Sequence, residues 1–351
     1  MEKIKVSIIG GAGYGAAEIL RQLSDRDDVE IHKISSKDYI GKKIGEVHRS
    51  MWGSDIVVED ISPKECVKGA DFVFLAMPHV ITAGVAMELF DEDVRIIDLS
   101  GDFRLENLTD YEVDYAPHHP CADRLGTFVY GMPELNGEAI KSAKHVASPG
   151  CFATGIALGL LPLAKNGHLK NSRIRTVAIT GSSGSGVNPI AGTHHPLRVN
   201  NLKTYKTLSH QHCSEIVQTL HNAGGDKISL DFVPVSGPLA RGILAVSQFD
   251  LPDELHLELV REMYHEYYES NPLVSVMPKG QSAEVVAIAG TARVEISLEA
   301  RKDEYSGKTT ISCVSAIDNL IKGGAGQAIQ CFNLMTGKAV NFGYEKAGLW
   351  P

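Results

Sequence analysis

Hydrophobic and polar positions alternate along the first part of the chain as they do where buried strands are separated by helices. Short apolar runs at residues 5–9, 29–34, 71–77 and 94–99 predict strands, and residues 16–23 have the composition of a helix. This order of elements predicts a parallel sheet with helices on both faces.

The pattern changes after residues 152–164, an apolar run that predicts a buried helix. Longer alternating stretches follow and predict a largely antiparallel sheet. Its expected strands are residues 175–180, 228–235, 243–249, 285–288, 293–298 and 309–315. A further amphipathic helix is expected after Asp253 as its cap, with a buried face of residues spaced by four: Leu255, Leu259, Met263 and Tyr267.

Composition places the chain among ordinary globular proteins. Of its 351 residues, 43% are hydrophobic and 22% are charged, which is typical of a soluble protein with a proper core. The formal net charge of -9 argues against nucleic acid or an anionic membrane surface as the main partner. A small anionic ligand remains compatible with this charge.

Cysteine usage and the N-terminal residues bear on the compartment. The six cysteines contain no CxxC pair, so the sequence suggests neither a zinc site nor a disulfide framework. The N-terminus runs into the first strand without the apolar core of a signal peptide, and the longest apolar run is too short for a bilayer. We therefore expect a cytoplasmic protein with reduced thiols.

A glycine-rich turn lies between the first predicted strand and helix. Glycines in this position allow a tight turn and a close approach of the backbone to a pyrophosphate, which binds at the helix N-terminus. The candidate dinucleotide-binding residues are Gly10, Gly11, Ala12, Gly13, Tyr14 and Gly15.

The end of the second predicted strand bears on the choice of dinucleotide. It carries Ser35, Ser36 and Lys37 in place of the acidic residue that binds a ribose 2′-hydroxyl. Hydroxyls and a lysine favour NADP over NAD, although Asp38 follows directly and leaves NAD open.

Cys151 is the leading candidate for chemistry. It follows Ser148-Pro149-Gly150, a turn-forming run, and precedes the apolar helix, so the cysteine is expected at a helix N-terminus. Unpaired backbone N–H groups and the helix dipole favour a nucleophilic thiolate there. The alternative is a small buried cysteine that only packs between loop and helix.

Histidines gather at His194-His195 and at His210-Gln211-His212. No third ligand at suitable spacing completes a metal site, so none is predicted. Ser209 is a possible cap for a helix beginning near His210, and a histidine at a helix N-terminus is held neutral, as a general base requires.

Residues 146–162, VASPGCFATGIALGLLP, resemble the active-site signature of N-acetyl-γ-glutamyl-phosphate reductases of arginine biosynthesis. The resemblance covers nearly the whole chain, with similar segments in family order. These segments are the glycine turn through Tyr14, DLSGDFR at 98–104, YGMPEL at 130–135, HQH at 210–212, RGIL at 241–244 and AIDNL at 316–320.

The resemblance implies an α/β fold in which a Rossmann NADP-binding domain is joined to a glyceraldehyde-3-phosphate-dehydrogenase-like α+β domain. Residues 1–150 and 323–351 would form the NADP-binding domain. Residues 151–322 would form the domain for catalysis, substrate binding and oligomerisation. Members of the family form homo-oligomers, so a dimer or tetramer is expected.

Site roles also follow from the resemblance. Cys151 would be the nucleophile and His210 the acid/base residue, with His212 as the other candidate for that role or as a substrate contact. His195 and Arg241 would bind the substrate carboxylate or phosphate. The NADP(H) contacts would be the glycine turn from Gly10 to Gly15 together with Ser35, Lys37 and Asn319.

The implied reaction is NADPH-dependent reduction of N-acetyl-γ-glutamyl phosphate, a small-molecule acyl phosphate, to the semialdehyde through a cysteine thioester. Residues 181–206 look closer to lysine-biosynthesis reductases that act on aminoadipyl phosphate bound to an acidic carrier protein. No run of Lys or Arg suggests a docking patch for that carrier, and the acetyl and N-succinyl substrates are not separated. A non-catalytic NADP-binding regulator is a further alternative, which the presence of both Cys151 and a suitable histidine disfavours.

Overall fold

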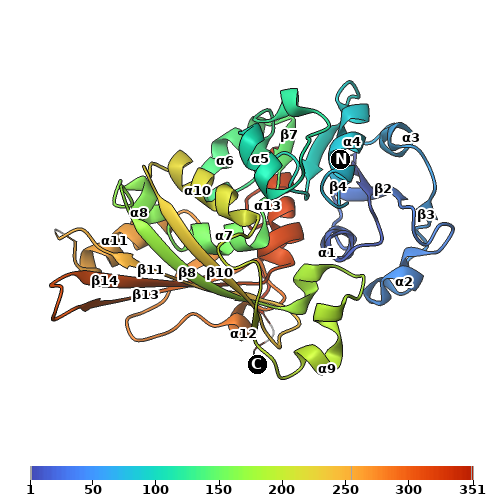
Figure 1. Ribbon diagram of the computed structural model, residues 1–351. Coiled ribbons are helices and arrows are strands. Elements are labelled where there is room, and N and C mark those ends of the chain that lie inside the picture. Colours follow the sequence, from blue (N-terminus) through green and yellow to red (C-terminus); the bar gives the residue numbers. More distant parts are fainter. Residues whose placement is uncertain (1, 254, 349, 351) are drawn as a thin grey trace. The chain divides into compact units, whose positions relative to one another are not determined.

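The computed structural model describes residues 2–253, 255–348 and 350, which fold into two compact units (Figure 1). Unit 1 comprises the described residues of Met1–Gly150 together with Gly324–Glu345. Unit 2 comprises Cys151–Gly323 together with the described residues of Lys346–Pro351. Residues 346–348, which we expected in the first domain, group with unit 2. There Gly348 packs so closely that a Cβ would lie 3.1 Å from Thr291 Cγ2.

Unit 1 is built on a parallel sheet of seven strands in the order β3-β2-β1-β4-β5-β7-β6. The predicted strands at residues 5–9, 29–34, 71–77 and 94–99 are confirmed as β1, β2, β4 and β5. The strand bounds are β1 Ile4–Ile9, β2 Val29–Ser35, β3 Val58–Glu59, β4 Phe72–Leu75, β5 Arg95–Asp98, β6 Val129–Tyr130 and β7 His145–Ala147.

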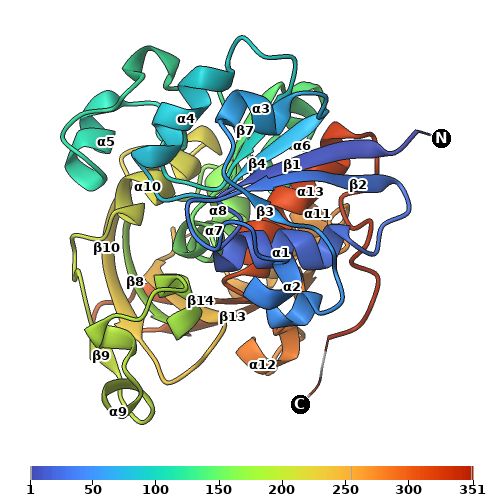
Figure 2. The same cartoon turned by 90° about the vertical axis from the view of Figure 1, so that its right-hand side faces the viewer.

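Helices cover both faces of this sheet (Figure 2). Strand β4 shows why its sequence is continuously apolar: Phe72 and Phe74 pack toward α1 (Tyr14–Leu23) and α13 (Gly326–Met335), and Val73 and Leu75 pack toward the opposite face. The helices of that opposite face are α3 (Pro63–Val67) and α4 (Ile81–Leu89). The remaining unit 1 helices are α2 (Ile44–Val47), α5 (Leu108–Asp114) and α6 (Pro133–Ser142).

Unit 2 contains a mixed sheet of seven strands in the order β12-β13-β14-β11-β8-β10-β9. The β8/β10 and β12/β13 pairs are parallel, and the four other neighbouring pairs are antiparallel. The strand bounds are β8 Arg173–Thr180, β9 Lys203–Thr204, β10 Ser229–Ser236, β11 Ile243–Asp250, β12 Val274–Val276, β13 Val294–Lys302 and β14 Thr309–Ile317.

The helix that carries Cys151 packs directly on this sheet. The predicted apolar helix forms two elements, α7 (Cys151–Leu158) and α8 (Leu161–Lys165), because Pro162 has no N–H to continue the first one. Ser315 of β14 donates a hydrogen bond of 2.6 Å to the Gly155 carbonyl, which fixes α7 to the sheet. The other helices are α9 (His195–Arg198), α10 (His212–Asn222), α11 (Leu257–Tyr268) and α12 (Val285–Ile288).

Two expectations for unit 2 are wrong. Residues 285–288 form helix α12, which packs against Leu244 and Val314 on the sheet face opposite α7. Helix α11 buries a different face from the one expected, namely Val260, Tyr264 and Tyr268, and its N-cap is His256. Both tyrosines turn inward because their hydroxyls donate to the carbonyls of Gly159 and Leu158, each at 2.5 Å, at the end of α7.

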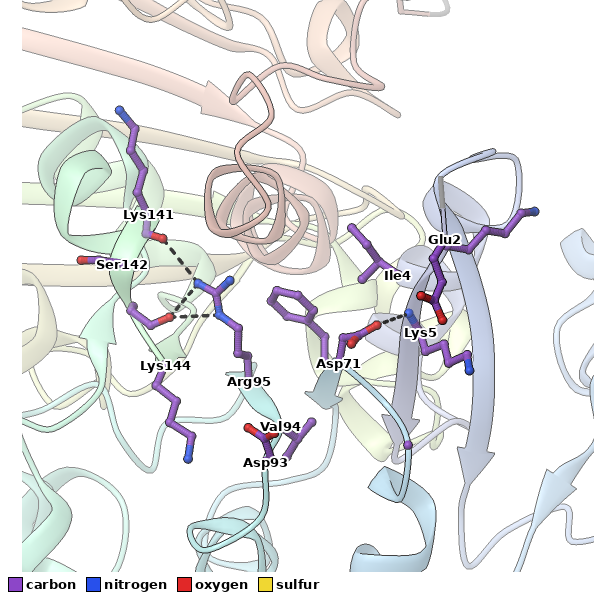
Figure 3. A pocket seen from close by; sticks show the side chains of 14 residues that line it. Glu2, Ile4, Lys5, Asp71, Asp93, Val94, Arg95, Lys141, Ser142 and Lys144 are labelled. Atoms are coloured by element: carbon purple, nitrogen blue, oxygen red, sulfur yellow. Dashed lines mark hydrogen bonds between the residues drawn. The ribbon is translucent and has the colours of Figure 1, made fainter.

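Arg95 joins several backbone ends in unit 1. Its guanidinium lies beside a cavity of about 950 Å³ at the amino ends of the strands, where it donates to the carbonyls of Lys141 and Ala143 (Figure 3). A third carbonyl, that of Met335 at the end of α13, accepts at 2.6 Å. Since a cation is favourable at a helix C-terminus, Arg95 stabilises the ends of α6 and α13.

Replacing this arginine is expected to destabilise the fold without touching the chemistry. We expect Arg95→Met to lower the free energy of unfolding by about 2–3 kcal/mol, because buried carbonyls lose a charged donor. Chemical denaturation measures this loss. The control is Lys144→Met, an exposed lysine on the same cavity, which should have little effect, and equal losses in both variants would contradict the role given to Arg95.

Candidate active site

Cys151 opens helix α7, as the sequence predicts. The first N–H groups of a helix have no acceptor within it, so they stabilise a thiolate or an oxyanion at this end. The thiol is half-buried and free of disulfides. Gly323 lies against it so closely that a Cβ at residue 323 would be 2.8 Å from the Cys151 Cβ.

Aromatic and histidine rings pack beside Cys151, around Phe152. The His210 ring lies 5.3 Å from that of Phe152 and 4.8 Å from that of His212, measured between centroids. Phe232 of β10 and Tyr205, just beyond β9, complete the group at 5.4 and 5.9 Å from His210. The structure therefore brings both predicted acid/base candidates next to the residue that follows Cys151.

His210 is buried and uncharged. Desolvation lowers the pKa of His210 to about 3, with further lowering from the neighbouring His212. The backbone N–H of His212 donates to Nδ1 of His210 at 3.1 Å, so in the neutral ring the proton is on Nε2. This bond lies at the start of α10. The N-cap residue of α10 is Gln211, not Ser209, and it makes no side-chain capping hydrogen bond.

Tyr205 connects this group to charges that the sequence did not single out. Burial raises the pKa of the Tyr205 phenol, a Cys151 thiolate raises it further, and the Arg198 guanidinium lowers it. Neither Tyr205 nor Arg198 was predicted as a site residue, since a tyrosine and an arginine in a polar segment resemble ordinary surface residues.

Arg241 and Asn319 meet at another part of unit 2. The Asn319 side-chain oxygen accepts from the Gly242 N–H at 2.6 Å, and its amide nitrogen donates to the Ser183 hydroxyl at 3.0 Å. Arg241 lies 3.7 Å from the buried carboxylate of Asp318. The Asp318 carbonyl in turn accepts from the N–H of Gly323, the residue that packs on Cys151.

His195 is placed differently from the other candidates. It begins the short helix α9 and its side chain is exposed. Within the part of the chain that the structure describes, no hydrogen bond or ring contact joins His195 to Cys151 or His210. Three positions further along α9, Arg198 is buried.

The candidate cofactor residues of the glycine turn lie in unit 1. Gly10 has φ +95°, and a Cβ there would lie 2.6 Å from the Ala76 carbonyl oxygen. A Cβ on Gly11 would lie 2.2 Å from Ile34 Cγ2, so both positions need glycine. The turn leads into α1, whose N-cap Gly13 has no side chain to cap the helix, and a helix start of this kind stabilises an anion. This arrangement fits a dinucleotide pyrophosphate.

The two residues proposed for the ribose end differ in exposure. Ser35 is buried at the end of β2, where burial raises the pKa of the Cys66 thiol and the Ser35 hydroxyl opposes this with a smaller lowering effect. Lys37 is exposed and pairs with Asp60 at 2.9 Å. Ser36 is half-exposed between them, and its hydroxyl accepts from the Asp38 N–H.

Two further observations concern metals and membranes. Within residues 2–253, 255–348 and 350, no group of three or more His, Cys, Asp or Glu side chains could hold a metal ion. No helix in the same part of the chain is long and apolar enough to cross a membrane.

Comparison with known proteins assigns the class. Residues 5–143 match the model of the semialdehyde dehydrogenase NAD-binding domain, and residues 151–319 match that of the semialdehyde dehydrogenase dimerisation domain. The fold is similar to that of aspartate semialdehyde dehydrogenase II of Vibrio cholerae, with a TM-score of 0.71 and 18% identity over 96% of this chain and 99% of that one. The Candida albicans aspartate semialdehyde dehydrogenase gives 0.67, with 14% identity over 97% and 99% of the two chains.

Curated relatives narrow the class to one family. N-acetyl-gamma-glutamyl-phosphate reductase of Pelotomaculum thermopropionicum is 36% identical over 99% of both chains. The enzymes of that name from Methanosphaera stadtmanae and Nitrosococcus oceani are 34% and 36% identical over at least 99% of each chain. The chain belongs to the N-acetyl-gamma-glutamyl-phosphate reductase family. It is an oxidoreductase of the acyl-phosphate-reducing type that uses a nicotinamide cofactor.

The buried neutral His210 predicts a pH dependence of stability. Below pH 6.5 the unfolded chain binds a proton at this histidine, whereas the folded protein does not until about pH 3. Stability is therefore lost as pH falls through this window, by an amount on the order of a few kcal/mol, and His145 adds a loss of the same sign. We expect His210→Gln to flatten this slope in denaturation curves measured from pH 4 to 7.

His195→Gln is the control, because an exposed side chain is hydrated in both states. An unchanged slope in His210→Gln would show that His210 is not held neutral by burial.

The contact between Gly323 and Cys151 predicts a catalytic defect. A methyl group at residue 323 must displace the nucleophile, so we expect Gly323→Ala to lower kcat by about a hundredfold, since small misplacements of reacting groups cost that much. Gly192→Ala is the control, since a Cβ there meets nothing within 4 Å. Wild-type kcat in Gly323→Ala would contradict the tight packing.

Proposed function

We propose that the chain reduces N-acetyl-γ-glutamyl phosphate to N-acetylglutamate 5-semialdehyde and phosphate, with NADPH, in arginine biosynthesis. The observation that carries this proposal is a cysteine at a helix N-terminus whose next residue, Phe152, packs against a buried neutral histidine, in a chain whose full-length relatives bear that name. A reduced thiol suits a cytoplasmic enzyme, and none of the six cysteines, all of which the structure describes, forms a disulfide.

The first half-reaction uses the start of α7. The Cys151 thiolate attacks the acyl carbon, a C–S bond forms, and the bond from that carbon to the phosphate oxygen breaks, so phosphate leaves with the electron pair. Backbone N–H groups at the helix start stabilise the oxyanion of the tetrahedral intermediate. The product is a thioester on Cys151.

The second half-reaction consumes the thioester. NADPH, when bound, supplies the hydride that reduces the thioester carbonyl. His210, with its proton on Nε2, donates a hydrogen bond to the carbonyl oxygen as charge develops there, in the manner of a neutral imidazole that polarises a carbonyl. Hydride addition leaves the hemithioacetal as its oxyanion. As this oxyanion collapses to the aldehyde, the C–S bond breaks and its electron pair restores the Cys151 thiolate.

Gly10 to Gly15 and the start of α1 would hold the pyrophosphate of the cofactor. Ser36 and Lys37 at the end of β2 support NADP over NAD, because hydroxyls and a cation suit a 2′-phosphate. Ser35 contributes through its backbone, since its carbonyl accepts from the N–H groups of Gly10 and Gly11 and fixes the turn. Asn319 fixes the loop of Ser183 in unit 2.

A homo-oligomer is part of the proposal, and the face of the unit 2 sheet opposite α7 supports it. Val233, Val177 and Val246 are neighbours across β10, β8 and β11 and share that face, beyond the part that α12 covers. Val177 is 45% exposed, which is unusual for a valine in the middle of a sheet. A second copy covering this face would remove the row of valines from water.

The direct test is the reverse reaction, phosphate-dependent reduction of NADP with N-acetylglutamate semialdehyde, run beside the N-succinyl and carrier-bound aminoadipate semialdehydes and with NAD in place of NADP. We expect turnover of the acetyl substrate with NADP. Activity on the carrier-bound substrate alone would move the chain to lysine biosynthesis. Absence of turnover with every substrate would favour the alternative of a non-catalytic NADP-binding regulator.

Cys151→Ser tests the covalent step. We expect turnover to fall by at least about a thousandfold, because a serine hydroxyl is not ionised at neutral pH, while NADPH binding measured by fluorescence stays unchanged. Cys213→Ser, which changes a half-buried thiol on α10, is the control and should retain activity. Substantial turnover by Cys151→Ser would remove the thioester mechanism.

A further inference from the structure

Arg198 is the one buried residue in a stretch of exposed ones. Its neighbours from residue 194 to residue 200 are all exposed, whereas the Arg198 side chain turns inward and the residue is 9% exposed. Arginine is rarely buried unless a partner compensates its charge. The burial of Arg198 therefore depends on what its guanidinium binds.

Neutral groups hold the guanidinium in place. One terminal nitrogen donates to the Thr180 carbonyl oxygen at 3.0 Å, and the other donates to the Ser236 hydroxyl. Thr180 and Ser236 are paired across β8 and β10, so Arg198 spans the carboxyl ends of two parallel strands. Its Nε has no hydrogen-bond partner, and no carboxylate of the described residues lies within ion-pair distance.

Tyr205 places this charge beside the candidate active site. Ser236, which accepts from Arg198, pairs with Lys203 of β9, and two residues further on the Tyr205 ring lies 5.9 Å from the ring of His210. Arg198 and a Cys151 thiolate also act electrostatically on the Tyr205 phenol. The cation therefore belongs to the same part of unit 2 as the nucleophile. Desolvation lowers the pKa of Arg198, so the protein retains this cation at a cost that a bound anion would offset.

We propose that Arg198 binds the free carboxylate of the substrate, which lies at the opposite end of the substrate molecule from the reacting acyl phosphate. This inference rests on the proposed function and names the part of the substrate that sets specificity. Nε and an adjacent terminal N–H form the planar fork that matches a carboxylate. The leaving phosphate must lie at Cys151 itself, whereas Arg198 lies at the carboxyl ends of β8 and β10, where it can meet a more distant group of the substrate.

The test compares two semialdehydes in the reverse reaction: N-acetylglutamate semialdehyde and the analogue in which its free carboxylate is a carboxamide. For Arg198→Met we expect KM for the carboxylate substrate to rise on the order of a hundredfold, since loss of one partner of a buried charge pair has that effect. KM for phosphate and NADP should stay unchanged. The variant should also lose the preference of the wild type for carboxylate over carboxamide.

Two further variants make the result interpretable. Arg301→Met removes an exposed arginine of β13 and should leave every constant unchanged. Arg198→Lys keeps the charge without the fork, and we expect KM between those of the wild type and Arg198→Met. It serves as the test if Arg198→Met does not fold, and then wild-type KM in Arg198→Lys overturns the proposal.

The other outcomes are distinct. A rise in KM for phosphate alone, or a carboxylate preference that survives in Arg198→Met, overturns the assignment of Arg198 to the carboxylate. A wild-type protein that turns over no semialdehyde at all refutes the proposed function itself. The wild-type measurement on the carboxylate substrate therefore separates failure of the function from failure of this inference.

Discussion

The seating of α7 on the sheet of unit 2 is the constraint on which the candidate active site depends. Ser315 binds the Gly155 carbonyl in the middle of the helix, and Tyr264 and Tyr268 bind the carbonyls at its end. Gly323 closes on Cys151 at its start. The helix therefore has little freedom to move, and its N-terminal N–H groups stay directed at the place where negative charge develops in acyl transfer.

Burial gives the histidine and the arginine near this helix opposite states. His210 is desolvated and loses its charge, so it becomes a neutral donor fixed by the His212 N–H. Arg198 cannot lose its charge at neutral pH and is instead surrounded by the Thr180 carbonyl and the Ser236 hydroxyl. A neutral donor suits a developing oxyanion, and a retained cation suits a permanent anion. The two residues thus support recognition of two different groups of one substrate.

Local sequence patterns predicted much of this arrangement. The sequence predicts the strands of unit 1 because buried parallel strands are continuously apolar. It predicts the start of α7 because Ser-Pro-Gly precedes an apolar run. The strand predicted at residues 285–288 is wrong because Val-Val-Ala-Ile is too short to distinguish a helix from a strand by its pattern. The inward face of α11 depends on carbonyls of α7, which are distant in sequence, so spacing alone could not reveal it. The burial of Arg198 is unpredictable from the sequence for the same reason, since it arises only where β8 and β10 end side by side.

The proposed reaction depends on a thioester at Cys151, and trapping that thioester tests the reaction more sharply than any rate measurement. The protein is mixed with N-acetyl-γ-glutamyl phosphate in the absence of NADPH, and the modified peptides are identified by mass spectrometry. We expect an acyl group on Cys151 that hydroxylamine releases and that NADPH removes as the semialdehyde. An unmodified Cys151 in a protein that still turns over, or an acyl group on another cysteine, would contradict it.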